Sequence, residues 1–290
     1  MAPPTLLALR PALSGGEGRN PFEVLFGHVL PHPIQRDDIL GSAFLGHHGD
    51  GEPLRLFGLT VWNIQAYQIL AVLLLFLAFR GVAGAVRSGG GGGFQRVMAG
   101  WAGWLREEVV FQYMDRHHGQ RLLPLFLFLF FFIFVQNALG LVPFGATATA
   151  SAYTNAGLAT VTFLCMILGG MLVQGPLTFW RNLIPHGLPA WLVPLMFVVE
   201  LIGLCVKPFA LTVRLFANMT GGHLVLLSFM GLIFYFGTNM GTGAGLGITP
   251  VGVGMSVFIM IIEGFVALLQ AYIFTLLSVI FVGMCLHPDH

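Results

Sequence analysis

The sequence predicts an all-α polytopic membrane protein, with about five membrane-embedded helices and one amphipathic helix at the interface. Hydrophobic residues make up 56% of the 290 residues and charged residues only 9%, whereas soluble domains carry about 25% charged residues. The apolar residues gather in runs that are long enough to cross a bilayer. Because every backbone polar group must be satisfied inside hydrocarbon, such runs predict helices. A net charge of +1 gives no reason to expect a nucleic-acid partner.

The first sixty residues differ from the rest of the chain. They are rich in Pro, His and Asp and carry both charge signs, which predicts a water-exposed N-terminal region over 1–60 and a membrane domain over 61–290. The first twenty residues contain no apolar run of signal-peptide length, so we expect no cleaved export signal, and an organellar presequence stays open. The first apolar span covers 61–79, and at about 1.5 Å per residue it is long enough for a hydrocarbon core of about 30 Å.

The stretch from 80 to 121 holds six arginines and three acids. Basic loops remain on the cytoplasmic side of a membrane, so we expect this stretch there. Within it, Trp101 and Trp104 alternate with Arg106 and Glu107, which predicts a helix over 94–113 that lies in the interface. The glycine run at 89–93 is not followed by Lys-Ser or Lys-Thr and is interpreted as a linker.

Two further spans, 122–142 and 156–174, are joined by a segment without charge, which we place on the outer side. A loop that contains Arg181 then returns to the cytoplasm. The next run, 191–236, is apolar for forty-six residues. It is too long for one upright crossing and is expected to be tilted, broken or both.

A glycine-rich segment without charge, 237–249, is predicted to be an outer loop, and 252–286 is a second overlong helix. The core of the membrane domain is therefore expected over 191–286. Five crossings place the N-terminus outside and the C-terminus in the cytoplasm, in agreement with the charge bias.

The run from 200 to 223 carries ionisable and amide side chains at membrane depth, where they are costly and indicate function. Glu200, Lys207 and Arg214 are seven residues apart and share one helix stripe, which Asn218 joins one turn later. His223 follows Arg214 by nine residues, which is about half a rotation, so the two side chains should not pair.

The last helix carries two polar residues that match this pattern. Glu263 precedes Gln270 by seven residues, about 10 Å along one face. An antiparallel arrangement brings Glu263 near His223 and Gln270 near Arg214. Imidazole titrates near neutral pH, so a His and Glu pair can hold and pass a proton, whereas Arg214 stays charged and can act only as a fixed cation.

These motifs carry a resemblance. The run Arg214-Leu215-Phe216-Ala217-Asn218-Met219, with Lys207-Pro208 before it and Gly222-His223 after it, resembles the signature of the ATP synthase subunit a family. The run from Glu263 to Phe274 resembles the last helix of that family. The likeness extends from about residue 100 to the C-terminus, with two separated motifs in the right order, and residues 1–60 match only loosely.

The resemblance implies a proton-conducting stator subunit of a rotary F-type ATP synthase, with its last two helices long and strongly tilted. His223 and Glu263 would line the inlet, in the form where acid and imidazole are exchanged relative to other members. Arg214, with Gln270 and Asn218, would face carboxylates of the rotor ring, and Glu200 would mark the inner outlet.

The implied partners are a ring of c subunits that each carry an Asp or Glu, peripheral stalk b subunits, the F1 head indirectly and the lipid bilayer. The sequence shows no nucleotide-binding motif, nucleophile constellation or metal-ligand spacing, so no cofactor, metal site or catalytic site is expected on this chain. The arginine-rich segment and the uncharged 146–150 stretch favour a bacterial inner membrane over an organellar one. Proton or sodium specificity stays open, as do ring size and direction of operation.

Structural alternatives stay open for each site residue. Arg214 could be an ion-paired or snorkelling arginine, and Lys207 could satisfy carbonyls freed by Pro208. Glu200 could pair with Lys207, while Asn218 and Gln270 could be interhelical hydrogen-bond partners.

Two other functions are weighed for the whole chain. A self-contained proton- or sodium-coupled transporter would show inverted repeats, and none is seen. An intramembrane hydrolase would need a glycine-framed nucleophile, which Ser228 and Ser256 lack. The doublets His47-His48 and His117-His118 have no metal-ligating companion in the sequence and are interpreted as solvated.

Overall fold

A computed structural model describes residues 33–35, 54–56, 59–82, 84, 92–141, 149, 151–183, 189 and 191–286. Two short paired strands, β1 (Arg55–Leu56) and β2 (Leu59–Thr60), precede a chain of helices. The helices are α3 (Asn63–Phe79), α5 (Gly93–Trp104), the π-helix η2 (Leu105–Val110), α6 (Phe111–Tyr113), α7 (Arg116–Gly140), α8 (Ala152–Gln174), α9 (Pro176–Asn182), α10 (Val193–Asn239) and α11 (Thr242–Leu286).

The all-α membrane fold is confirmed. Four helices, α7, α8, α10 and α11, are long and apolar enough to cross a membrane, and α3 is a shorter apolar helix. The chain is a multi-pass membrane protein. Of the predicted N-terminal region, only 33–35, 54–56 and 59–60 fall within the described residues, and His47-His48 lie outside them.

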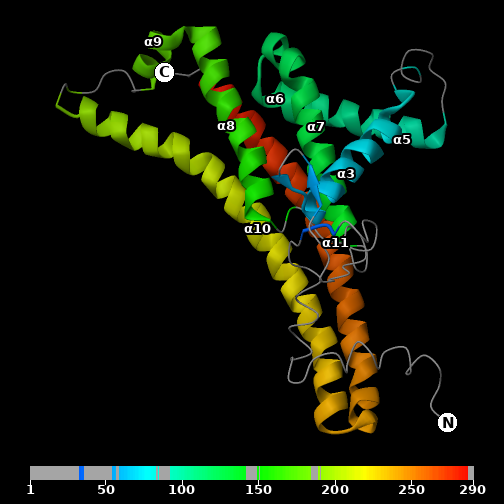
Figure 1. Ribbon diagram of the computed structural model, residues 1–290. Helices are drawn as coiled ribbons and strands as arrows, with labels where there is room; N and C mark the ends of the chain where they lie inside the picture. Colours follow the sequence, from blue (N-terminus) through cyan, green and yellow to red (C-terminus); the bar gives the residue numbers. More distant parts are fainter. Residues whose placement is uncertain are drawn as a thin grey trace.

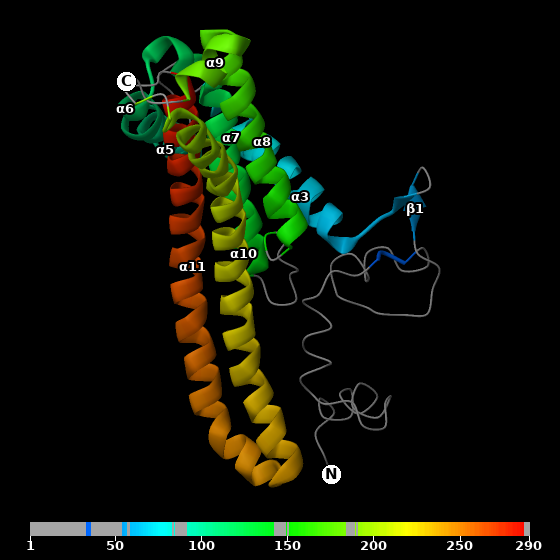
Figure 2. The ribbon, with the colours of Figure 1, turned by 90° about the vertical axis from the view of Figure 1, so that its left-hand side faces the viewer.

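The two longest helices form a hairpin that extends beyond the other described helices (Figure 1). α10 has 47 residues and α11 has 45, so each is overlong, as the sequence predicts. They lie side by side near the turn that joins them, and α10 diverges from α11 toward its own N-terminal end (Figure 1). Figure 2 shows the hairpin turn at one end of the molecule and α5, α6 and α9 at the other. α10 is tilted relative to α11 and continues through Pro208 without a break.

The prediction of an outer loop over 237–249 is wrong. α10 continues to Asn239 and α11 begins at Thr242, so a tight turn at Gly241, with φ of 92°, is enough to join them. The glycines have another use. A Cβ atom at Gly245 would lie 2.7 Å from the Cα of Gly237, so the missing side chains let the two helices approach closely, as small residues do in membrane helix pairs.

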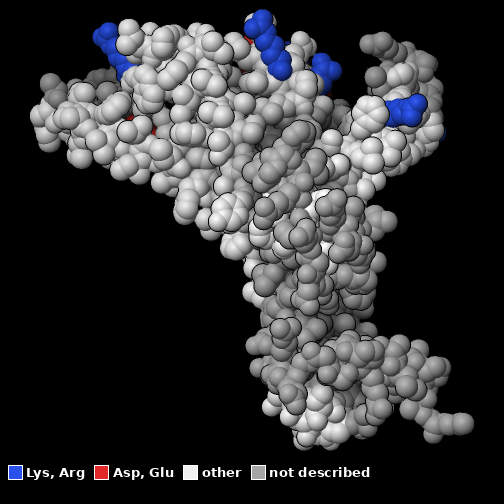
Figure 3. All heavy atoms as spheres, in the orientation of Figure 1, with Lys and Arg blue, Asp and Glu red and all other residues white. Residues whose placement is uncertain are grey.

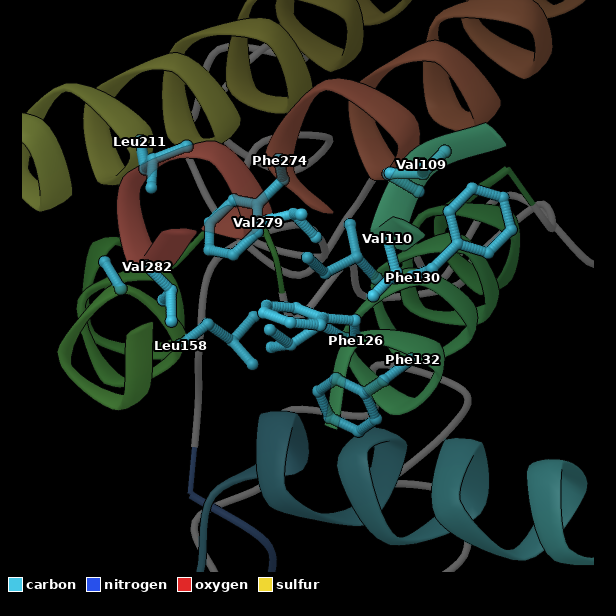
Figure 4. Packing of buried hydrophobic residues seen from close by; sticks show 14 of the residues in the cluster. Val109, Val110, Phe126, Phe130, Phe132, Leu158, Leu211, Phe274, Val279 and Val282 are labelled. Carbon is cyan, nitrogen blue, oxygen red and sulfur yellow. The ribbon is translucent and has the colours of Figure 1, made fainter. Parts of the chain in front are cut away.

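Aromatic and aliphatic side chains fill the interior, and they come from α3, η2, α7, α8, α9, α10 and α11. Phe126 of α7, Leu158 of α8 and Phe274 of α11 converge, and Leu211 approaches from α10 (Figure 4). Phe132 points toward α3 in the same view. In a bilayer lipid tails are as apolar as these side chains, so close packing rather than water exclusion supplies their stabilisation.

The predicted interfacial helix over 94–113 is only partly regular. α5 leads directly into η2, where the N–H of Phe111 donates to the carbonyl of Arg106, and then into α6. The π turn brings Val109 and Val110 to fully buried positions. α5 lies across the direction of α11 in Figure 1, and Trp101 contacts the rings of Phe130, Phe131 and Phe134 of α7.

The prediction of a loop around Arg181 is also wrong, because this segment forms the short helix α9. Gly175 adopts φ of 88° and ends α8, and Pro176 takes the first position of α9, where its missing N–H is harmless. The basic side chains visible in Figure 3 gather at the end of the molecule that carries α5, α6 and α9.

Candidate functional site: polar groups along the long hairpin

The polar residues of α10 divide between two faces of the helix. His223 belongs to the buried row that packs toward α11, with Leu215 and Met219, whereas Arg214 is exposed. The half rotation between Arg214 and His223, predicted from their spacing, is therefore present in the structure. No described acid forms an ion pair with Arg214. The alternative that Arg214 is a structural, ion-paired arginine therefore finds no support among the described residues.

His223 and Glu263 face each other across the hairpin. Nδ1 of His223 lies 3.6 Å from Oε1 of Glu263, and their side chains are 11% and 5% exposed. This separation exceeds hydrogen-bond length, and Glu263 Oε1 has no hydrogen-bond partner among the described residues. The antiparallel register expected from the sequence thus brings an acid and an imidazole into one buried site without a direct bond between these two atoms.

The glycine before His223 makes room for this acid. A Cβ atom at Gly222 would overlap the carboxyl group of Glu263. At Gly221, one residue earlier, a Cβ would meet no described atom within 4 Å. Gly222 therefore leaves space for the Glu263 carboxyl group, and His223 places an imidazole next to it.

Gln270 reaches α10 one turn beyond Arg214. Its Oε1 accepts a hydrogen bond of 2.9 Å from Nδ2 of Asn218, and the side chain is 2% exposed. The sequence places Gln270 near Arg214, and the structure adds that the direct partner of Gln270 is Asn218. The buried amide of Gln270 is thus fixed to α10 one helical turn from the exposed Arg214.

Glu200 and Lys207 line a cavity of about 80 Å³ at the other end of α10. No ion pair joins them within the described part of the chain, so the alternative of an internal Glu200 and Lys207 pair finds no support there. Nζ of Lys207 lies 5.4 Å from the ring centroid of Phe281. The hairpin therefore carries a buried acid and imidazole toward its turn, an exposed arginine in the middle and a polar cavity toward the opposite end.

Residues 60–283 match the family model described as ATP synthase A chain. The chain belongs to the ATP synthase subunit a family. Three bacterial relatives bear the name ATP synthase subunit a. The one from Chloroherpeton thalassium is 37% identical over 275 residues, which cover 89% of this chain and 80% of the relative. The relative from Chlorobium phaeobacteroides is 34% identical over 273 residues, 92% and 76% of the two chains. That from Afipia carboxidovorans is 30% identical over 266 residues, 90% and 100%.

Membership in the ATP synthase subunit a family makes this chain a membrane subunit of the ATP synthase complex and not its catalytic subunit. The matched stretch includes every predicted site residue from Glu200 to Gln270 and begins near the start of α3. Ser228 and Ser256, considered as nucleophiles, each donate a hydrogen bond to a carbonyl of their own helix, those of Leu224 and Gly252. Both hydroxyl groups are thus engaged in hydrogen bonds within their own helices.

Sequence reasoning missed a buried polar cluster beside the hairpin. Asn137 of α7 donates to the carbonyl of Ala267 at 3.3 Å and accepts a 2.6 Å hydrogen bond from Thr149. Asn155 of α8 donates to the carbonyl of Thr149 at 2.7 Å. Next to Asn137, Gln136 is fully buried and neither amide atom has a hydrogen-bond partner among the described residues. Two adjacent amides at the end of an apolar span were the feature that could have indicated this cluster.

The expectation that His117-His118 has no potential metal-ligating companion is wrong, because Asp115 lies close to both residues. The side chain of Asp115 accepts a hydrogen bond from the backbone N–H of His117, and its Oδ2 lies 3.7 Å from Nδ1 of His118. The potential ligand atoms of these three residues lie within 4.8 Å of one another. Asp115 is the N-cap of α7, which accounts for its place here.

Proposed function

We propose that this chain is the proton-conducting stator subunit of a rotary F-type ATP synthase, with two half-channels and with Arg214 facing the carboxylates of a rotor ring. One observation carries the proposal. Along α10, Glu200 precedes Arg214 by about 21 Å and His223 follows it by about 13 Å at the usual helical rise. The exposed cation thus separates two polar sites that have no described contact with it.

The outer half-channel uses Glu263 and His223. Each can hold a proton, and the 3.6 Å between Glu263 Oε1 and His223 Nδ1 closes to hydrogen-bond length with a small side-chain movement. A proton that arrives from outside is taken up by this pair and passed on toward the ring. Asn137 and Thr149, hydrogen-bonded beside Ala267 on α11, give the same side of the bundle a polar interior.

Arg214 separates the two half-channels. Its guanidinium keeps its charge at any physiological pH, so it stabilises an ionised ring carboxylate but cannot relay a proton. A ring carboxyl group that faces lipid stays protonated, because desolvation disfavours its charged form. The Asn218 and Gln270 hydrogen bond holds neutral polar groups beside the arginine.

The inner half-channel opens at the cavity that Glu200 and Lys207 line. The protonated ring carboxyl group releases its proton there, and the carboxylate that results then passes Arg214. Each proton that crosses 100 mV supplies about 2.3 kcal/mol, so several protons are needed for each ATP. Without Arg214 the ring carboxyl could move back and forth between the half-channels and dissipate the gradient.

The same proposal fixes orientation, domains and partners. The basic end of the molecule (Figure 3) faces the bacterial cytoplasm by the positive-inside rule, which puts the hairpin turn and the N-terminus outside. Residues 61–290 form the membrane domain and 1–60 a water-exposed region. The exposed apolar faces of α10 and α11 meet lipid and the c ring, while b subunits clamp the bundle and link it to the F1 head.

Arg214→Ala tests the proposal in inverted vesicles that carry the whole complex. We expect the variant to assemble with the ring and the ATPase head but to lose ATP-driven acidification, because the separating charge is gone. Assembly is measured on the same preparation by co-purification. Normal pumping by the assembled variant would overturn the proposal.

A further inference from the structure

The junction of α8 and α9 forms a polar clamp on the end of α11. Nε2 of Gln174 donates a 2.7 Å hydrogen bond to the carbonyl of Cys285, and Oε1 of Gln174 accepts a 3.0 Å hydrogen bond from Nδ2 of Asn182. Cys285 lies in the last turn of α11, where backbone carbonyls lack helical partners. One side chain therefore joins α8, α9 and the end of α11.

Tight packing holds the same junction together. A Cβ atom at Gly170 would overlap the ring of Phe179 and would lie 2.9 Å from the carbonyl oxygen of Cys285. Phe179, on α9, is 3% exposed. The turn at Gly175, with φ of 88°, aims α9 back over α8, so that Asn182 can reach Gln174. The position of the Gln174 amide is thus set by backbone geometry as well as by its hydrogen bonds.

The clamp forms one wall of the cavity that holds Glu200 and Lys207. Gln174, Asn182 and Cys285 line it from one side, and the two charged residues of α10 line it from the other. Its volume of about 80 Å³ is room for more than one water molecule. The rest of the lining is apolar and consists of Phe179, Leu183, Leu204 and Met284.

We propose that Gln174 and Asn182 are positioning residues of the inner half-channel: they hold the end of α11 apart from α10, so that water reaches Glu200. This inference rests on the proposed function, because it assigns a supporting pair to the outlet. When the clamp is lost, the apolar neighbours can close over the cavity and its water is expelled. Proton release from the ring then slows although Arg214, His223 and Glu263 are untouched.

The test measures passive proton flow through the membrane sector of assembled complexes after removal of the ATPase head. Gln174→Ala removes both hydrogen bonds, and Asn182→Ala removes only the bond to Gln174. We expect flow per assembled complex to fall about threefold to tenfold for Gln174→Ala, the factor that corresponds to the net worth of a hydrogen bond, and less for Asn182→Ala. Thr178→Ala is the matched control, since Thr178 lies exposed on the same short helix and outside the cavity lining.

A second measurement separates positioning from general damage. With Cys165 and Cys205 replaced by Ala, Cys285 is the remaining thiol and lines the cavity. A small methanethiosulfonate reagent added from the cytoplasmic side should modify it more slowly in Gln174→Ala than in the parent chain. The rate in Thr178→Ala should match the parent.

The outcomes distinguish this inference from the proposed function. If both clamp variants conduct protons and react with the reagent like the parent, the clamp does not shape the outlet, although loss of pumping in Arg214→Ala would still support the stator. If Gln174→Ala does not assemble, Asn182→Ala decides alone, and unchanged flow and labelling in it overturn the inference. Faster labelling in either variant would also overturn it, because the clamp would then obstruct the cavity instead of holding it open.

Discussion

At the residue scale, adjacent glycines on α10 have different surroundings. A methyl group at Gly222 would overlap the Glu263 carboxyl group, and one at Gly221 would meet no described atom within 4 Å. We predict that Gly222→Ala displaces the carboxylate and slows passive proton flow severalfold, while Gly221→Ala leaves it unchanged. Both changes replace a helical glycine by Ala and gain a similar amount of helix propensity, up to about 1 kcal/mol. A difference in proton flow between the two variants therefore reports the contact of position 222 with Glu263. Equal flow in the two variants would contradict the proposed inlet geometry.

The pair of His223 and Glu263 allows a second residue-scale prediction. Because the acid and the imidazole occupy one buried site, His223→Glu alone would place two carboxyl groups there, and Glu263→His alone would place two imidazoles. We expect each single variant to lose most ATP-driven pumping and the double exchange to recover part of it. Pumping is measured per assembled complex in inverted vesicles. Additive losses in the double variant would show that the two residues do not act as a unit.

At the element scale, the glycines of the α10–α11 hairpin predict a packing effect. A Cβ at Gly245 would lie 2.7 Å from the backbone of Gly237, whereas one at Gly247 would meet no described atom within 4 Å. Backbone cannot move aside as a side chain can, so Gly245→Ala should destabilise the hairpin by about 1–3 kcal/mol, as overpacking does. Gly247→Ala should be neutral or slightly stabilising. The fraction of intact complex after heating in detergent measures both, and equal survival would contradict the close approach.

The elements differ in how far the sequence predicts them. Apolar runs predict α7, α8, α10 and α11, because a bilayer admits few alternatives to a helix. The segment over 237–249 is misassigned because glycine favours turns and also close helix contacts, and only the partner helix decides between them. The site shows the same limit. Glu263 beside His223 follows from helix spacing, but the bond from Asn137 to the Ala267 carbonyl joins residues 130 positions apart, and no local pattern predicts it.

At the scale of the whole molecule, the distribution of charge predicts an orientation. Basic side chains gather at the α9 end (Figure 3), while the hairpin turn at the opposite end (Figure 2) carries no charged residue from 224 to 262. Membrane insertion favours an arrangement in which the arginines stay on the cytoplasmic side and the uncharged hairpin passes through the bilayer. The turn should therefore lie outside and α9 inside.

Two cysteine substitutions test this orientation in chains whose three native cysteines are replaced by Ala. Met240→Cys lies at the hairpin turn, where the parent side chain is 68% exposed, and Thr178→Cys lies exposed on α9. A membrane-impermeant maleimide should modify Met240→Cys faster in intact cells and Thr178→Cys faster in inverted vesicles. Permeabilised membranes give the reference rate for each site. The opposite pattern would reverse the orientation, and with it the assignment of His223 and Glu263 to the inlet and of Glu200 to the outlet, because both follow from which end of the hairpin faces the cytoplasm.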